Sequence, residues 1–170
     1  MLWNIPAEIL VTWIWFIVYM ALIVHGKGPI GGSFFYVKEV QERVIELGLI
    51  TRKEMDIRRK RAVFGLIAGD LALLFLLIVL VNHAKTFYEC AWQFYVLMAG
   101  MELYDLCAVD LYWVAGTEWW DIPGTEDLRD LWHGADFKKK KIIGKCVFFV
   151  ICVPPAALFG WIFSLIANLL

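Results

Sequence analysis

The stretch AVFGLIAGDLALLFLLIVLV covers residues 62–81 and has one charged residue, Asp70, among its twenty residues. A helix of about 20 apolar residues crosses the roughly 30 Å hydrocarbon layer of a bilayer. The four residues before it, 58–61, are all basic, and basic residues beside a span stay on the cytoplasmic side. The stretch therefore predicts a transmembrane helix that enters the membrane from the cytoplasm.

Three other stretches are long and apolar enough for the same role, at residues 9–24, 87–114 and 142–169. The whole chain of 170 residues is 61% hydrophobic and 19% charged, whereas an average soluble domain is about half apolar and a quarter charged. We therefore expect an all-α, polytopic membrane protein with four transmembrane helices in a single domain over residues 1–170. The partner that this composition implies is the lipid bilayer.

The basic residues alternate in number from one connection to the next. Nine of the sixteen lie between the first two predicted spans, six lie at the connection between the last two, and Lys85 lies in the turn between the middle spans. This bias predicts that residues 26–61 and 116–141 are cytoplasmic and that both termini are outside, in a multi-pass protein of a bacterial cytoplasmic membrane. A net charge of -1 argues against a nucleic-acid partner.

The first cytoplasmic connection has a helical pattern of its own. Apolar residues recur at three- and four-residue steps, at Val37, Val40, Val44 and Leu47. Gly48 is a natural end for this helix, and Thr51 with Glu54 forms a capping box that starts another. We expect an amphipathic helical hairpin whose second helix continues into the span at residues 62–81.

Four acidic residues lie inside the second and third predicted spans: Asp70, Glu102, Asp105 and Asp110. A carboxylate in the middle of a bilayer costs about 2.5 to 3.5 kcal/mol on insertion scales, and we expect no Lys or Arg of the spans to neutralise these four. A proton, a metal ion or a cationic substrate would then have to balance their charge. In the alternative, Glu102 is neutral and hydrogen-bonds to Tyr95, Tyr104 or a backbone carbonyl, so that it only holds helices together.

The positions of these acids on their helix also differ. Glu102 and Asp105 are three residues apart and share one helix face. Asp110 lies nearer the cytoplasmic end of the span, where we expect it to reach water.

Small residues and prolines mark two further features of the spans. Gly65 and Gly69 are four residues apart and predict a face where another helix can approach closely. Pro154 and Pro155 interrupt the fourth span, and proline removes helical hydrogen bonds. We therefore expect a kink at that point.

The connection before the fourth span contains DIPGTEDLRDLWHGADF, residues 121–137, with a turn predicted at Pro123 and Gly124. Glu126, His133 and Asp136 are residue types that bind divalent cations, although their spacing fits no established motif. They form a candidate cytoplasmic loop site. A divalent cation is the cofactor that they suggest, and the metal is unknown.

This loop follows YDLCAVDLYW, residues 104–113. Together the two segments resemble an uncharacterised family of small four-span bacterial membrane proteins with a D-x4-D helix, a PGTE loop and a Gly that opens the last span. The matching residues are Asp105, Asp110, Pro123, Gly124, Thr125, Glu126, Asp136 and Gly144. Leu111 stands where the family pattern has Trp, and the basic run at residues 138–141 replaces the stretch that holds its His. The resemblance implies the topology and no particular reaction.

Three functions are compatible with these residues. The leading hypothesis is a small transport protein, a homo-oligomer through the Gly65 and Gly69 face, that moves a cation, a proton or a proton-coupled solute past the membrane acids. A second is a metal-dependent enzyme that acts on a lipid headgroup at the cytoplasmic interface, using Asp110, Glu126, His133 and Asp136. A third is a non-catalytic partner-binding or immunity subunit that docks through the amphipathic hairpin. The sequence favours the first over an enzyme.

Overall fold

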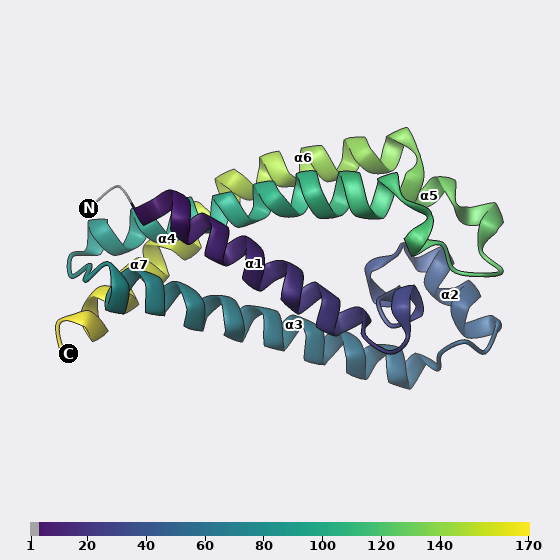
Figure 1. Ribbon diagram of the computed structural model, residues 1–170, viewed down its shortest axis with the longest axis horizontal. Coiled ribbons are helices and arrows are strands. Elements are labelled where there is room, and N and C mark those ends of the chain that lie inside the picture. The colour runs from purple at the N-terminus through teal and green to yellow at the C-terminus, as the bar shows by residue number, and fades with distance from the viewer. Residues whose placement is uncertain (1–3) are drawn as a thin grey trace. The chain divides into compact units, whose positions relative to one another are not determined.

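The computed structural model describes residues 4–170 and is helical, with no strand in that range. Its α-helices are, in chain order, α1 (Ile5–Val24), α2 (Lys38–Glu46), α3 (Arg52–Phe75), α4 (Phe87–Tyr104), α5 (Asp130–His133), α6 (Ala135–Ile151) and α7 (Val153–Ala167) (Figure 1). Two π-helical segments continue α3 and α4, namely η4 (Leu76–Val81) and η5 (Asp105–Val114). The short 3-10 helices are η2 (Gly28–Ile30), η3 (Ser33–Phe35), η6 (Glu118–Trp120) and η7 (Glu126–Leu128). The predicted all-α class is confirmed.

Two helices of residues 4–170 are long and apolar enough to cross a membrane: α1, and the continuous helix Arg52–Val81 that α3 and η4 form. A third candidate is the pair Glu126–Ile151 and Val153–Ala167, whose two parts meet at 44°. The predicted span at 87–114 is not among them, and polar residues such as Gln93 and Glu102 lower its apolarity. The chain thus has two or three helices suited to a membrane, which does not match the expected four.

The bend between α6 and α7 confirms the kink expected from the two prolines. Pro154 and Pro155 stand in the first turn of α7, where a helix has no internal partner for backbone N–H groups. Cys152 lies between the two helices and is buried. Proline is therefore tolerated here because a new helix starts at this point.

The described residues form two compact units. Unit 1 contains the chain up to Phe16 and residues 67–104 and 144–170, and unit 2 contains residues 17–66 and 105–143. In unit 1, α4 packs along α7. A Cβ atom on Gly160 of α7 would lie only 2.6 Å from the Cα atom of Ala91 on α4, so glycine is what allows this close approach.

In unit 2, the first half of the predicted hairpin is the amphipathic helix α2. Val40 and Val44 of its apolar face are fully buried, and Leu47 is half-exposed. Gly48 ends the helix with φ of 70°, in the left-handed region that glycine favours. The predicted amphipathic helix and its end are confirmed.

The second half of the hairpin is the start of α3. The Thr51 hydroxyl accepts a hydrogen bond of 3.2 Å from the backbone N–H of Glu54, which is one of the two bonds of a capping box. The helix then continues without a break into the apolar stretch, as predicted. Arg43 of α2 binds both carboxylate oxygens of Asp127 at 3.1 Å, so α2 is fixed to the loop before α5.

Burial of α2 also bears on its expected docking role. Val40 and Val44 have no exposed surface and pack inside unit 2, whereas Val37 and Leu47 of the same stripe are exposed. Packing within the chain therefore explains the middle of the apolar stripe, at Val40 and Val44.

Candidate functional site

Asp70 of α3 lies in unit 1 beside an indole ring from α1. The Trp15 Nε1–H donates a hydrogen bond of 2.8 Å to Asp70 Oδ1. Gly69 makes room for the ring, because a Cβ at this position would lie 2.2 Å from a ring carbon of Trp15. No Lys or Arg among the described residues forms an ion pair with Asp70. Asp70 is thus held by a neutral donor.

Gly65, one turn earlier, accommodates α1 in the same way within unit 2. A Cβ at Gly65 would lie 2.4 Å from the Tyr19 hydroxyl, and this hydroxyl donates to the Ala62 carbonyl at 2.8 Å. The prediction that these glycines receive another helix is confirmed, but that helix is α1 of the same chain. The expectation that this face joins copies of the chain is wrong, because aromatic side chains of α1 already fill it.

Glu102 of α4 has a basic partner, which corrects the expectation that no Lys or Arg neutralises the membrane acids. The Lys145 ammonium of α6 forms an ion pair with Glu102 inside unit 1. Lys145 was assigned to the cytoplasmic connection, yet α6 is one helix from Ala135 to Ile151 and carries it among apolar residues. The Tyr95 hydroxyl, proposed as a partner of Glu102, donates instead to the Phe149 carbonyl at 3.2 Å.

Asp70 and Glu102 belong to one electrostatic cluster. Glu102 lies near Asp70 and also near the thiol of Cys152 at the bend between α6 and α7. The unit 1 cluster, defined as Asp70, Glu102, Lys145 and Trp15, therefore combines two carboxyl groups with one ammonium group. With both acids ionised, it has a net charge of one negative unit.

Glu8 is a buried acid that the sequence reading missed. It is 4% exposed, and neither carboxyl oxygen accepts a hydrogen bond of normal geometry from the described residues. Asn82 lies beside it and donates to Gln93 at 2.7 Å. The predicted span began at residue 9, whereas α1 begins at Ile5 and takes Glu8 into its first turn. Extending the span by one helical turn would have included this residue.

Asp105 and Asp110 lie in unit 2, on η5. A π-helix bonds residue i to residue i+5, so these two residues are about one turn apart. Asp110 is 5% exposed and forms an ion pair of 2.7 Å with Lys141, whose ammonium also lies 5.2 Å from the centre of the Phe137 ring. The expectation that Asp110 reaches water is wrong, because the start of α6 covers it.

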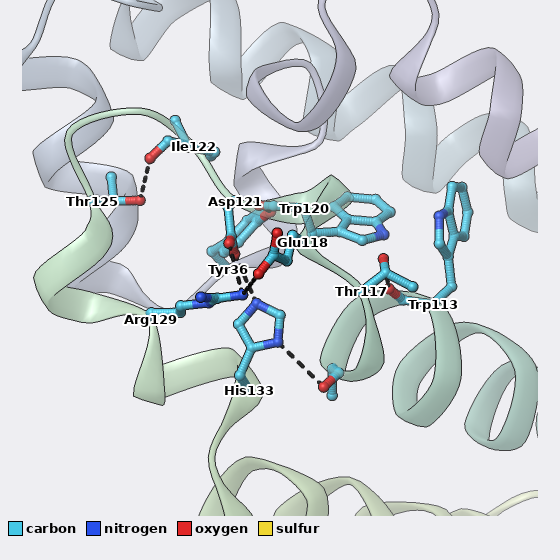
Figure 2. Close-up of polar contacts among 11 residues, drawn as sticks. Tyr36, Trp113, Thr117, Glu118, Trp120, Asp121, Ile122, Thr125, Arg129 and His133 are labelled. Atoms are coloured by element: carbon cyan, nitrogen blue, oxygen red, sulfur yellow. Dashed lines mark hydrogen bonds and ion pairs between the residues drawn. The ribbon is translucent and has the colours of Figure 1, made fainter.

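The loop around η6 and α5 is a second polar cluster, in unit 2 (Figure 2). The Asp121 carboxylate lies 2.7 Å from His133 Nε2 and forms an ion pair of 3.1 Å with Arg129 Nη2. Arg129 forms a second ion pair with Glu118. His133 Nδ1 contacts the Ala115 carbonyl at 3.2 Å. This network fixes the loop from two sides.

Tyr36, Trp120 and Trp132 form an aromatic core next to these charged residues. The Tyr36 hydroxyl donates to the Trp120 carbonyl, and Trp120 and Trp132 are almost fully buried. Burial, and to a lesser extent the Asp121 charge, raises the pKa of Tyr36 above its usual range, so the phenol remains a donor. The rings of Trp120 and Trp132 both pack against the ring of Tyr36 in this core.

The three residues of the candidate loop site do not meet. His133 bonds Asp121 and Ala115, Glu126 accepts from the Gly124 N–H at 2.9 Å, and Asp136 lies exposed in the first turn of α6. The Gly124 hydrogen bond holds the pKa of Glu126 below its usual range. Among residues 4–170, no group of three or more His, Cys, Asp or Glu is placed to hold a metal ion. Gly124 has φ of 84°, which confirms the turn.

Comparisons of the chain with protein-family models, with curated proteins and with solved structures found no match.

Proposed function

We propose that the chain is a four-span protein of the bacterial cytoplasmic membrane that moves a proton or another cation, or a solute coupled to one, past Asp70 and Glu102. The helices that are apolar enough to span a membrane support the membrane setting. The alternation of basic residues supports both termini outside and residues 26–61 and 116–141 inside.

The observation that carries the proposal is the charge imbalance of the unit 1 cluster. The one ammonium group, that of Lys145, pairs with Glu102, and Asp70 has an indole in place of a basic partner. A buried charge without compensation is costly in a membrane. A proton or a small cation therefore balances the cluster, and its release to one side and uptake from the other would be the transport step.

The residues of the cluster have different roles in this proposal. Asp70 takes up and releases the cation, while Trp15 stabilises its ionised form by donating a hydrogen bond. Glu102 and Lys145 form a fixed ion pair in the same cluster. In unit 2, Asp105 and Asp110 are further acids on η5, and Asp110 is held by Lys141.

A homo-oligomer remains part of the proposal, because four helices enclose little polar volume. Its contact must be a surface other than Gly65 and Gly69, which pack against α1. Exposed apolar residues such as Phe64 and Ile67 of α3 offer such a surface.

The test is proton or cation flux in vesicles that contain the purified chain, measured with an internal dye while a membrane potential is imposed. Asp70→Asn keeps an acceptor for the Trp15 N–H but cannot be ionised, so we expect flux to fall at least about tenfold. Asp56→Asn, an exposed acid of the same helix, is the matched control and should leave flux unchanged. Glu102→Gln should change the pH dependence of flux. Equal flux and equal pH dependence in wild type, Asp70→Asn and Glu102→Gln would mean that transport past these acids does not occur.

A further inference from the structure

Unit 2 contains a pocket of about 550 Å³ that the proposed transport does not use. Tyr19 and Leu22 line it from the end of α1, and Ile57, Arg58 and Arg61 line it from α3. The two helices are tied together here by the hydrogen bond from Tyr19 to the Ala62 carbonyl. In Figure 1 the end of α1 lies beside the first half of α3. The pocket is therefore framed by the two helices best suited to cross a membrane.

One side of the pocket is basic. Lys53, Arg58 and Arg61 of α3 line it, together with a single acid, Glu54. Glu54 is already paired with Lys27 at 2.8 Å and with Arg58 at 3.2 Å. Lys53 and Arg61 form no ion pair with any described residue. An anion would neutralise this excess of positive charge.

The other side is apolar and opens outward. Leu22 is 64% exposed and Ile57 is 40% exposed. Leu22 lies in the last turn of α1, and Ile57 lies on α3 directly before the basic residues 58–61, which lead into the apolar stretch of residues 62–81. This is the position of the boundary between lipid headgroups and hydrocarbon at the cytoplasmic surface. The pocket thus combines a basic side with an apolar side at the level where a phospholipid has both parts.

We propose that the pocket binds one anionic phospholipid, with its phosphate between Lys53, Arg58 and Arg61 and the start of an acyl chain along Leu22 and Ile57. Clustered Lys and Arg beside a membrane helix attract anionic lipids, each contributing roughly 1 kcal/mol near the surface. A soluble phosphate would use only the basic side, and it would leave the apolar side exposed to water. The lipid accounts for both sides, so it is the occupant that fits the lining best.

The experiment compares two double variants with the same change in charge on the same helix. Lys53→Gln with Arg61→Gln removes two residues of the pocket, whereas Arg59→Gln with Lys60→Gln removes two neighbours outside it. Each full chain is placed in nanodiscs of equal phosphatidylglycerol and phosphatidylcholine. Native mass spectrometry then counts the lipids that remain bound to the protein after it is released from the nanodisc. The wild type should retain phosphatidylglycerol in preference to phosphatidylcholine, and the pocket variant should retain about thirtyfold less of it.

The control variant should retain phosphatidylglycerol nearly as the wild type does. Equal losses in both double variants would show general attraction to the membrane surface and would overturn the proposal. Ile57→Ser should weaken retention of the lipid without affecting glycerol phosphate, the headgroup alone. If glycerol phosphate displaces the lipid at equal concentration and Ile57→Ser has no effect, the pocket is a site for free anions and the proposal is wrong. Should the pocket double variant not fold, Arg61→Gln against Arg59→Gln gives the same comparison.

Discussion

Lys141 shows how one basic residue can compensate the charge of a buried acid. Its ammonium is the ion-pair partner of Asp110, whose side chain is 8% exposed, while its own side chain is 38% exposed. Removing one partner of a fully buried pair costs about 3 to 5 kcal/mol because the other charge loses its compensation. Partial exposure of Lys141 reduces this cost, since water can reach the site.

We predict that Lys141→Met lowers the free energy of unfolding by about 2 kcal/mol, less than for a fully buried pair. Lys140→Met, an exposed neighbour, should change it by less than about 0.5 kcal/mol. Adding Asp110→Asn to Lys141→Met should restore most of the loss, because no unpaired charge remains. Unfolding by denaturant in detergent measures all three. Equal stability of the Lys141→Met and Lys140→Met variants would contradict the pairing.

Glu126 gives a pH-dependent prediction for the cytoplasmic loop. Its pKa is lowered mainly because the ionised carboxylate accepts the Gly124 N–H, so the contribution of this bond is complete above the ordinary Glu pKa. The bond is lost as the pH falls through the lowered value. The Gly124 amide proton resonance should therefore titrate below the ordinary Glu range, and Glu126→Gln should abolish that titration. A resonance that shifts at the ordinary Glu pKa would argue against the bond.

Residue identities were predictable, but residue partners were not. The acids Asp70, Glu102, Asp105 and Asp110 stand out in apolar stretches, so composition alone finds them. Pairing depends on where α6 lies, which no local pattern gives. A clue existed, because Lys141 and Lys145 are four residues apart and share one face of a helix.

For the helices, sequence patterns within one turn predicted the local structure correctly, whereas contacts between distant segments could not be predicted. The apolar stripe of α2, Gly48 and the Thr51 cap involve neighbours within one turn, so the sequence was sufficient to predict them. The π-helical segments η4 and η5 were not predictable, because their residues are the same types that form α-helices.

The contact of α1 with α3 is tested by a pair of glycine substitutions. Gly69→Ala places a methyl group where Trp15 now lies and should destabilise the protein by about 1 to 3 kcal/mol through overpacking. Gly144→Ala on α6 meets no atom within 4 Å, and should stabilise by up to about 1 kcal/mol because Ala favours helix. Thermal unfolding in detergent compares the two. A neutral Gly69→Ala would show that Trp15 is not packed there.

For the whole molecule, hydropathy predicts the membrane setting better than the number of spans. The helix Arg52–Val81 and α1 are clear candidates, whereas α4 is too polar to qualify on composition. The polar residues of α4 form contacts inside unit 1: Gln93 accepts a hydrogen bond from Asn82, and Glu102 pairs with Lys145. A helix that places polar groups against its neighbours does not need to be apolar all round, so a composition test underestimates it.

The proposed topology predicts which positions are accessible from outside the cell. In a chain without its native cysteines, Asn168→Cys should react with a membrane-impermeant maleimide on intact cells, because the carboxyl end is proposed to lie outside. Lys139→Cys, in the proposed cytoplasmic connection, should react only after the cells are opened. The reverse pattern would mean that the orientation is inverted, and reaction of both would rule out four spans in this arrangement.

The most direct test of the central claim is the infrared spectrum of the reconstituted protein as the pH or the cation in the buffer is changed. We predict that a carbonyl band of a protonated carboxyl group appears in the wild type as the pH is lowered, is displaced by any cation that the protein carries, and is missing in Asp70→Asn. Identical difference spectra for wild type and Asp70→Asn would contradict the claim, because Asp70 would then keep one charge state and could not exchange a proton or a cation.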